Sequence, residues 1–346
     1  EWGRRMTEQP LVCICIPNYN AAGTVRETLA SILAQTYPNF VVHISDNAST
    51  DDTINVIESL ADPRIIIHRN ETNIGGEGNF NRCIQLAEGK YTAIFHADDL
   101  YEPQMVEREV AFLESHPEAG AVFTAASIID ETGKRCGEID FPASLGSFDR
   151  LYEFETIFKS VLRHSNFFIC PSVMARTRVY QQDIRSWRGN LFKSSADLDV
   201  WLRIAQKYPI GLLPARLMRY RISASQFSAQ VRLQTARLDF FLVTEHYLAQ
   251  EDVRRMLAPI DLENYARLDR RDRVMRAVNC FLSARSGDAQ SLLHDIFSRD
   301  AWKAGIQTQR GFGVLVAGIY LRGLLLFGLE KTGRFTLGYL KRIMRK

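Results

Sequence analysis

The feature that most constrains the fold is an apolar run, residues 91–97, that stops at two adjacent carboxylates, Asp98 and Asp99. Its β-branched and aromatic residues predict a strand buried on both faces of a parallel sheet. Open α/β sheets bind ligands at the carboxyl ends of their strands, where this pair would lie. Such a pair suits a hard divalent cation held jointly with substrate phosphates. A second interpretation stays open here, in which the aspartates cap a helix that Pro103 opens.

Strand-like apolar runs alternate with segments of helical periodicity over much of the chain. This alternation predicts an α/β fold with a mostly parallel, doubly wound sheet. The expected strands are residues 11–16, 40–45, 64–68, 91–97, 120–129 and 167–175. The expected helices are residues 24–35, 54–60, 80–87, 100–115 and 194–208. Residues 130–148, rich in Gly, Asp and Ser, are expected to form a loop.

The chain has 346 residues, enough for one large domain and an appendage. We predict a catalytic domain over residues 1–230 and a helical region over residues 231–346. The net charge of +3 hides an asymmetry, because residues 1–210 carry a net charge of about −8 and residues 211–346 about +11. A basic region of this kind can bind nucleic acid or anionic lipid. Its apolar and aromatic residues favour lipid, so we expect no nucleic-acid partner.

The C-terminal segment, residues 311–346, combines an apolar stretch that Arg322 interrupts with six basic residues after Glu330. A spanning helix needs about 20 apolar residues, and a central Arg costs about 2.5–3.5 kcal/mol on insertion scales. We therefore favour an amphipathic helix on an anionic membrane surface and leave a packing helix and a span open. Because the first ten residues are polar and carry no secretory signal, we expect a cytoplasmic protein, peripheral on the inner face of the cell membrane.

Five short motifs follow one another along the first 230 residues. They are Ile16-Pro17-Asn18-Tyr19-Asn20, Ser45-Asp46-Asn47 with residues 48–53, Asn73-Ile74-Gly75, His96-Ala97-Asp98-Asp99, and Ala196-Asp197-Leu198-Asp199 with residues 200–202. In order and spacing they resemble the inverting family-2 glycosyltransferases of GT-A fold, which serve in bacterial polysaccharide and glycoconjugate assembly. The resemblance implies sugar transfer from a UDP or dTDP donor to a hydroxyl of a glycan or a lipid-linked acceptor.

The resemblance assigns donor-binding roles to residues of the first four motifs and to one asparagine that follows the third. These residues are Pro17, Asn18, Tyr19, Asn20, Asp46, Asn73, Gly75, Asn81 and Asp98. Asp46 would accept the N3–H of uracil or thymine, whereas cytosine lacks that donor. Members of the family often have an arginine just before the asparagine that Asn81 matches, whereas this chain has Phe80 there.

The remaining carboxylates would carry the chemistry. The resemblance implies that Asp99, with Asp98, holds Mn²⁺ or Mg²⁺, which neutralises the charge of the departing diphosphate. Asp197 would be the general base at the start of a helix. The acidic residue that precedes this base in the family is Ala196 here, which removes a neighbouring charge but leaves the base.

Other polar residues have weaker assignments. For His96 we favour a strand-end histidine outside the site. His164, Asn166 and Trp187 lie in the region where such enzymes bind the acceptor, and we hold them as acceptor contacts. For Asp199 we favour a structural role.

Two alternative functions compete with sugar transfer. A nucleotidyltransferase that forms sugar nucleotides would share a similar sheet, but it needs a glycine- and arginine-rich loop where this chain has Pro17-Asn18-Tyr19-Asn20. A catalytically silent protein that binds sugar nucleotides as a scaffold is the other alternative. It is disfavoured because the metal and base carboxylates are all present.

Overall fold

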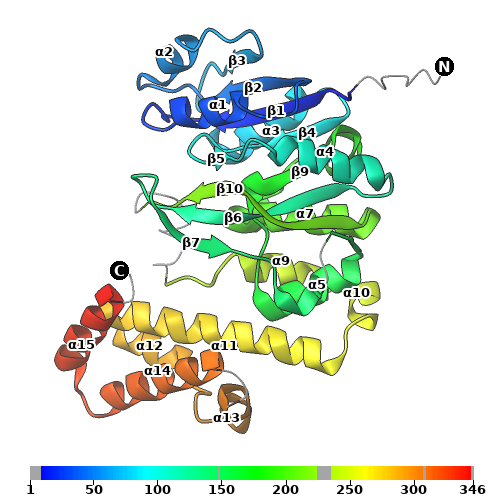
Figure 1. The fold of residues 1–346 in the computed structure, drawn as a ribbon. Helices are drawn as coiled ribbons and strands as arrows, with labels where there is room; N and C mark the ends of the chain where they lie inside the picture. Colours follow the sequence, from blue (N-terminus) through cyan, green and yellow to red (C-terminus); the bar gives the residue numbers. More distant parts are fainter. Residues whose placement is uncertain (1–8, 147–148, 224–234, 307–308, 344–346) are drawn as a thin grey trace. The chain divides into compact units, whose positions relative to one another are not determined.

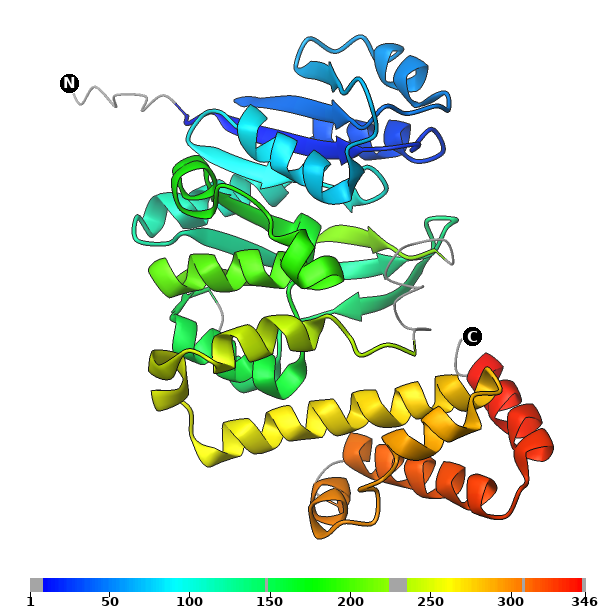
Figure 2. The same ribbon diagram turned by 180° about the vertical axis from the view of Figure 1, so that it is seen from behind.

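The computed structural model of the chain describes residues 9–146, 149–223, 235–306 and 309–343 (Figures 1 and 2). The chain divides into two compact units, Glu1–Val161 with Asn166–Ser223, and Leu162–Ser165 with Ala224–Lys346. Every residue predicted to bind donor, hold metal or act as base belongs to the first unit. The domain boundary that we predict near residue 230 stays a prediction.

A ten-stranded mixed sheet organises the first unit. Its strands are β1 (Val12–Asn18), β2 (Phe40–Asp46), β3 (Ile65–Arg69), β4 (Tyr91–Ile94), β5 (Leu100–Tyr101), β6 (Ala121–Ile129), β7 (Arg135–Ile139), β8 (Leu151–Tyr152), β9 (Val173–Arg176) and β10 (Ile210–Arg221). The order is β3-β2-β1-β4-β9-β6-β10-β5, with β7 paired to β6 and β8 to β10. β1 to β4 are parallel, as are β6 and β10, and β9 lies antiparallel between the two groups. The mostly parallel α/β sheet is therefore confirmed.

Helices cover both faces of this sheet. The helices in this part of the chain are α1 (Val25–Leu33), α2 (Thr53–Glu58), α3 (Gly75–Leu86), α4 (Met105–Ser115), α5 (Phe154–His164), whose end belongs to the second unit, α6 (Gly189–Phe192) and α7 (Ala196–Lys207). Val12, Ile14 and Ile16 of β1 join the apolar core that contains residues of α1 and α4. On the other face, the Sγ of Cys15 contacts the carbonyl oxygen of Cys83 in α3, and Trp201 of α7 packs edge-on against Phe123 of β6. The alternation of side chains along each strand thus supplies both layers.

Several local predictions were wrong, among them the start of the helix expected over residues 80–87, which begins at Gly75 as α3. The sequence did not predict β10, whose interior holds Pro214 and whose register shifts on both sides of Arg216. The expected loop over residues 130–148 contains β7, because this segment pairs with β6. The expected helix over residues 100–115 begins only at Met105, because the residues before it pair with β10 as β5. The expected strand over residues 167–175 is shortened to β9 by a 3₁₀ turn, Cys170–Ser172.

The second unit is helical in its described part. Its helices are α9 (Phe240–Leu248), α10 (Glu251–Arg255), α11 (Pro259–Leu282), α12 (Ser286–Leu292), α13 (Arg299–Ile306), α14 (Gln309–Leu326) and α15 (Glu330–Ile343). Apolar residues of α11 to α14 form its core, among them Phe281, Leu315 and Leu321. No helix in the described residues is both long and apolar enough to cross a membrane.

Candidate functional site

Four of the five sequence motifs follow the carboxyl ends of β1 to β4 and so lie at one edge of the sheet. The chain runs from β1 outward to β3 and returns on the other side of β1 as β4. Open α/β sheets bind their ligands at such a reversal of strand order. At this edge Pro17 and Asn18 pair in register with Ser45 and Asp46.

The Asp98–Asp99 turn after β4 is held by elements far away in the sequence. Asp99 is fully buried, and its Oδ1 accepts a hydrogen bond from the backbone N–H of Arg221 at 2.7 Å. The hydroxyl of Thr28 in α1 donates to the carbonyl oxygen of Asp99 at 2.8 Å. The alternative in which the aspartates cap a helix is therefore wrong, because Asp99 bonds to β10 and α4 begins later, at Met105.

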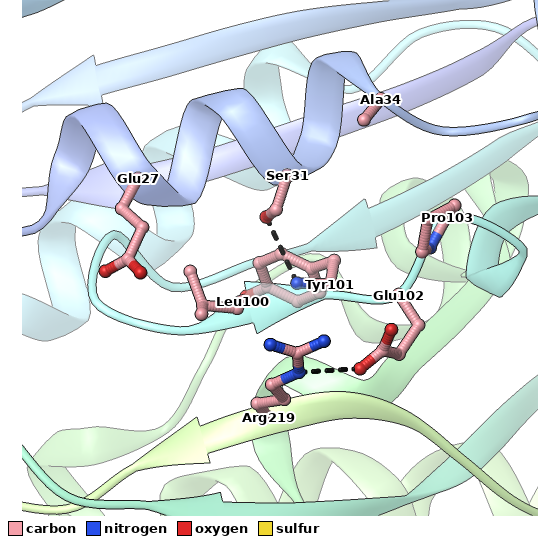
Figure 3. A pocket seen from close by; sticks show the side chains of 8 residues that line it. All are labelled: Glu27, Ser31, Ala34, Leu100, Tyr101, Glu102, Pro103 and Arg219. Carbon is pink, nitrogen blue, oxygen red and sulfur yellow. Dashed lines mark hydrogen bonds and ion pairs between the residues drawn. The ribbon is translucent and has the colours of Figure 1, made fainter. Parts of the chain in front are cut away.

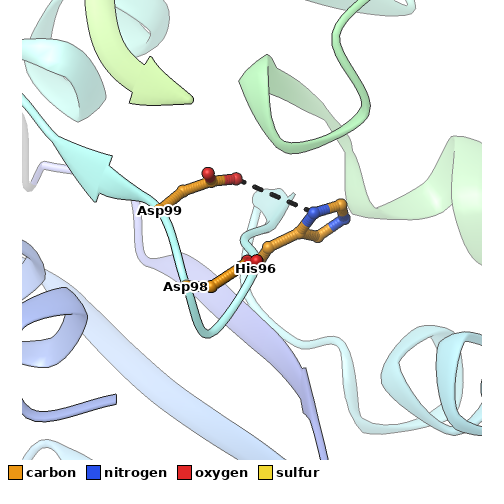
Figure 4. A group of neighbouring side chains, drawn as sticks. All are labelled: His96, Asp98 and Asp99. Carbon is orange, nitrogen blue, oxygen red and sulfur yellow. Dashed lines mark ion pairs between the residues drawn. The ribbon is translucent and has the colours of Figure 1, made fainter. Parts of the chain in front are cut away.

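His96, Asp98 and Asp99 form a group that fits a divalent cation. Their ligand atoms all lie within 4.8 Å of one another (Figure 4). The Oδ2 of Asp99 is 3.8 Å from the Nδ1 of His96 and has no hydrogen-bond partner among the described residues. Burial, with the charge of Asp98, raises the pKa of Asp99 well above its ordinary range, and burial lowers the pKa of His96. A cation would stabilise the ionised carboxylate of Asp99 and could bind the neutral imidazole of His96. We expected His96 to lie outside the site, but it belongs to this group.

Asp46 is buried, and neighbouring side chains hold its carboxylate in place. Its Oδ1 accepts from the Nδ2 of Asn18 at 2.8 Å and from the hydroxyl of Ser49 at 2.5 Å, and its Oδ2 accepts from the backbone N–H of Ser49 at 3.1 Å. The Ser49 hydroxyl also accepts the N–H of Asn20, while the side chain of Tyr19 is exposed. The first two motifs thus form one hydrogen-bonded surface.

Asn47 fixes the loop of the third motif. Its Nδ2 donates to the Oδ1 of Asn73 at 2.9 Å, and its Oδ1 accepts the N–H of Ile74 at 2.9 Å. Gly75 follows at φ +77°, a conformation that other residues rarely adopt, and it begins α3. Sequence reasoning assigned no role to Asn47, although its place beside Asp46 in the second motif was a usable signal.

Asn79 is a second residue that sequence reasoning missed. It is buried in α3, where its Oδ1 accepts from the hydroxyl of Ser45 at 2.6 Å. Its Nδ2 donates to the carbonyl oxygens of Ser45 at 2.9 Å and Asn18 at 3.3 Å. The glycine-rich start of α3 is thereby tied to the ends of β1 and β2.

Aromatic contacts connect α3, His96 and α7. Phe80 packs on Trp187 with ring centroids 4.6 Å apart and meets the ring of His96 edge-on at 5.8 Å. The Oδ1 of Asn81, predicted to bind donor, accepts the backbone N–H of Trp187 at 2.7 Å. Trp187 in turn meets the ring of Trp201 in α7. The segment before α7 is therefore anchored to the same side of the molecule as His96.

Asp197 lies half-buried in the first turn of α7. Burial raises its pKa from the ordinary 3.8 to about 6, although hydrogen bonds from the N–H of Leu198 and from Asn166 oppose the rise. The Nδ2 of Asn166 donates to the Oδ2 of Asp197 at 3.3 Å. A carboxylate with this pKa can remove a proton near neutral pH. His164, the third expected acceptor contact, belongs to the second unit.

The charges of Asp197 and of the cation-binding group both act on the thiol of Cys170. Burial raises the pKa of this thiol, and the charges of Asp197 and Asp99 raise it further. The fourth and fifth motifs therefore each place a carboxylate within electrostatic range of this half-buried cysteine.

Asp199, two residues after Asp197, is fully buried. Its Oδ2 accepts from the Nε of Arg188 at 2.9 Å and from the Nε of Arg203 at 3.0 Å. These bonds anchor the first turn of α7 and support the structural role that we predicted for Asp199.

A pocket of about 220 Å³ lies next to the carboxylate turn (Figure 3). Its lining residues are Glu27, Ser31, Ala34, Leu100, Tyr101, Glu102, Pro103 and Arg219. None of the residues predicted to be catalytic, donor-binding or metal-binding lines it. Leu100 and Tyr101 directly follow Asp99, so this pocket lies beside the turn and is distinct from the predicted donor site.

Comparisons with known proteins agree with this geometry. The model named Glycosyl transferase family 2 matches residues 13–184. A relative named as a glycosyltransferase, EpsE of Bacillus subtilis, is 30% identical over 207 residues, which cover 58% of this chain and 69% of EpsE. A glucosyltransferase of Escherichia coli, WfaP, is 36% identical over 105 residues, which cover 30% of this chain and 42% of WfaP.

The fold itself matches a solved glycosyltransferase. The mannosyltransferase PcManGT of Pyrobaculum calidifontis superposes with a TM-score of 0.55 at 17% identity, covering 96% of this chain and 86% of PcManGT. The fold is therefore GT-A. Together with the sequence relatives, the motifs and the cation-binding group lead to one conclusion, that this chain is an enzyme belonging to glycosyltransferase family 2.

Proposed function

We propose that this glycosyltransferase inverts the anomeric centre in a single displacement, moving a sugar from a UDP or dTDP donor to a hydroxyl of a glycan or lipid-linked acceptor. The proposal rests on one observation, that the predicted site holds two groups of carboxylates in different surroundings. Asp98 and Asp99 fit a cation, whereas Asp197, with its pKa of about 6, suits proton transfer. Widely different carboxyl environments in one site are how enzymes separate such roles.

The chemistry follows from these two centres. Asp197 would accept the proton of the acceptor hydroxyl while the hydroxyl oxygen attacks the anomeric carbon of the donor. The bond between that carbon and the diphosphate oxygen breaks in the same step, its electron pair leaves with the diphosphate, and the configuration inverts. A Mn²⁺ or Mg²⁺ ion held by Asp98 and Asp99, with His96 beside them, would supply positive charge for the departing diphosphate.

The geometry around Asp46 supports a uracil or thymine donor. A carboxylate offers about four lone-pair sites, and Asp46 uses three of them on Asn18 and Ser49. One acceptor site is left for a base N3–H, which cytosine lacks. The name of WfaP describes a UDP-glucose donor and a diphosphoundecaprenol-linked acceptor, which agrees with the proposed donor and acceptor classes. PcManGT was solved with GDP-mannose and Mn²⁺, which supports the cation but makes GDP a necessary competitor in any test.

A thermal-shift panel tests the donor and the cation together. UDP, dTDP, GDP and CDP are each added with Mn²⁺ or with EDTA to the wild type, to Asp99→Ala and to Asp252→Ala, an exposed carboxylate in α10. UDP or dTDP at 100 times its Kd stabilises by about 2.7 kcal/mol. We expect that shift with Mn²⁺ only, in the wild type and in Asp252→Ala. A full shift in Asp99→Ala, or equal shifts by all four nucleotides, contradicts the proposal.

Turnover distinguishes the competing functions. A transferase releases nucleoside diphosphate from its donor and stops when EDTA removes the cation. A silent scaffold binds the same donor without turnover in either condition. A nucleotidyltransferase instead joins a nucleoside triphosphate to a sugar phosphate and releases pyrophosphate from the triphosphate. Release of nucleoside diphosphate that depends on Mn²⁺ is the expected result.

We also propose that the C-terminal segment binds an anionic membrane surface on the cytoplasmic face. Phe312, Val316 and Tyr320 are 58%, 49% and 43% exposed and recur every four residues along one side of α14. Phe327 and Phe335 beyond them are each 78% exposed. Such a row of exposed apolar side chains suits insertion into the headgroup region.

Basic residues beside this apolar row would add electrostatic attraction of about 1 kcal/mol each near anionic lipid. Lys331 and Arg334 lie in α15. The side chains of Lys341 and Arg342, and the residues Arg345 and Lys346, lie outside the part that the structure describes. Salt should weaken vesicle binding without abolishing it, because the apolar contribution is not screened.

Point substitutions test this surface better than deletion of residues 311–346, because the deletion would remove Leu315 and Leu321 from the core of the second unit. The triple variant F312S/F327S/F335S should lose at least about tenfold in binding to vesicles of phosphatidylglycerol and phosphatidylcholine. The control is Leu262→Ser, 49% exposed in α11. Vesicle binding of the triple variant equal to that of the control would mean that this surface does not bind lipid.

A further inference from the structure

Arg221, the last residue of β10, contacts both carboxylate residues of the cation-binding group. Its backbone N–H donates to the Oδ1 of Asp99 at 2.7 Å, and its Nε donates to the carbonyl oxygen of Asp98 at 2.8 Å. The residue is only 5% exposed. One buried residue therefore holds two consecutive positions of the turn, through its backbone and its side chain.

The guanidinium of Arg221 also joins this turn to two other segments. Its Nη2 donates to the Oε2 of Glu27 in α1 at 2.7 Å. Its Nη1 lies 3.3 Å from the carbonyl oxygens of Asp130 and Glu131, in the turn between β6 and β7. A planar fork of fixed donors can hold several acceptors at once, which a lysine ammonium on a flexible stem does less well.

This arrangement has a consequence for Asp99. Because Arg221 occupies the Oδ1, the carboxylate is fixed in orientation, and the buried Oδ2 faces His96 without a hydrogen-bond partner in the described chain. The nearby guanidinium also favours the ionised form of Asp99. Ligands of a metal are held by neighbours in this way, and loss of such a neighbour typically costs about 10–100-fold in metal affinity.

We infer that Arg221 is a positioning residue that orients the Asp98–Asp99 turn and thereby sets the affinity of this group for a divalent cation. The inference rests on the proposed metal-assisted transfer. The backbone N–H, Nε and Nη2 of Arg221 donate to protein atoms, so its proposed role is to hold the cation-binding residues in place. Its backbone N–H, which a substitution retains, holds the carboxylate of Asp99, and its side chain holds the carbonyl of Asp98. Loss of the side chain should therefore change cation affinity far more than the rate at saturating cation.

The test measures Mn²⁺ binding directly, by electron paramagnetic resonance titration of free Mn²⁺ with the full chain. In Arg221→Gln we expect the Kd for Mn²⁺ to rise about tenfold or more, and in Arg221→Lys, which keeps the charge but not the fork, to rise less. The matched control is Arg219→Gln, two residues earlier on β10, where the arginine pairs with Glu102 at the surface. Its Kd should stay within about twofold of the wild type.

Kinetics at raised Mn²⁺ separate positioning from catalysis. In Arg221→Gln, the kcat for nucleoside diphosphate release should recover most of its wild-type value once Mn²⁺ saturates, while the apparent KM for Mn²⁺ stays high. A kcat that remains low at saturating Mn²⁺ would overturn a positioning role, as would an unchanged Kd in the folded variant. Folding is checked by circular dichroism.

A second variant covers the case in which Arg221→Gln does not fold. Glu27→Gln removes the charged partner of Arg221 at a position that is largely exposed, and it should raise the Kd for Mn²⁺ by a few fold. An unchanged Kd in Glu27→Gln would then overturn the inference. Absence of Mn²⁺ binding in the wild type would overturn the proposed function as well, whereas wild-type binding with unchanged variants overturns the role of Arg221 alone.

Discussion

The raised pKa of Asp197 makes the acid side of the pH–rate profile the most direct test of the general base. Burial moves this pKa from 3.8 to about 6, a change of about 3 kcal/mol in favour of the neutral acid. With a pKa of 6, about 97% of the carboxyl is ionised at pH 7.5 but only about a tenth at pH 5. Because only the ionised form accepts a proton, log kcat should rise with a slope of one below pH 6 and level off above it.

Asn166 provides an internal check on this assignment. Its Nδ2 donates to the Oδ2 of Asp197 at 3.3 Å, and that bond lowers the pKa of Asp197. A hydrogen bond to a carboxylate contributes about 1.5 kcal/mol or less when it is this long, which corresponds to about one pH unit at most. Asn166→Ala should therefore move the acidic limb to higher pH by up to about one unit and leave the rate at pH 8.5 near the wild-type value.

The assay is the initial rate of nucleoside diphosphate release at saturating donor and acceptor between pH 5 and 8.5. Mn²⁺ must be saturating at every pH, because protons compete with the cation at Asp98 and Asp99. Asp197→Asn should lose about 10²-fold or more in kcat with little change in donor affinity, and its profile should have no limb near pH 6. A limb that persists in Asp197→Asn, or a collapse of donor binding, would refute the assignment.

Three further predictions concern stability and the donor base. Glu109→Leu should raise the free energy of unfolding at pH 7 by about 1–3 kcal/mol in urea titrations. The reason is that both carboxylate oxygens of Glu109 are buried without a partner in the described residues, and burial raises the pKa of this carboxyl. The gain in stability should shrink as the pH falls toward 4.5, because the carboxyl of the wild type is then neutral. Burial and the charge of His43 lower the pKa of His68, so the free energy of unfolding should fall as the pH drops below about 6.5. His68→Gln should make the free energy of unfolding less dependent on pH in this range. The control His294→Gln, at an exposed position, should leave that dependence unchanged. Asp46→Asn should raise the Kd for UDP about tenfold in calorimetry; an unchanged Kd would mean that Asp46 is only structural.

The predictable part of the fold was the part that local patterns determine. Parallel strands buried on both faces are short apolar runs with polar ends, and β1, β2 and β4 have that form. β10 does not, because Pro214 interrupts it and three arginines are interspersed among the residues of its second half. Its strand character comes from pairing with β6 and β5, partners about 90 to 120 residues away in the sequence. Nothing local indicates that pairing.

The same limit applies to the site. The candidate ligand carboxylates Asp46 and Asp99 could be proposed from the sequence because they end apolar runs, where α/β sheets bind ligands. Two residues of their surroundings, Asn79 and Arg221, could not be predicted. Asn79 bonds to Ser45 and Asn18 beside Asp46, and Arg221 bonds to Asp99. Their partners are backbone and side-chain atoms of strands and turns that come together only in the folded sheet. An arginine at the end of an unpredicted strand carries no signal of its own.

A comparison of Asp99 with Glu109 shows why a raised pKa does not by itself identify a functional group. Burial raises the pKa of both carboxyls, and each has an oxygen without a partner in the described chain. Only Asp99 has one oxygen fixed by a donor and a second carboxylate and an imidazole within ligand distance. Mn²⁺ should therefore raise the Tm of the wild type and of Glu109→Leu by the same amount, since distant changes add, and should not raise that of Asp99→Ala. A Mn²⁺-induced shift that vanished in Glu109→Leu and persisted in Asp99→Ala would place the cation elsewhere in the chain.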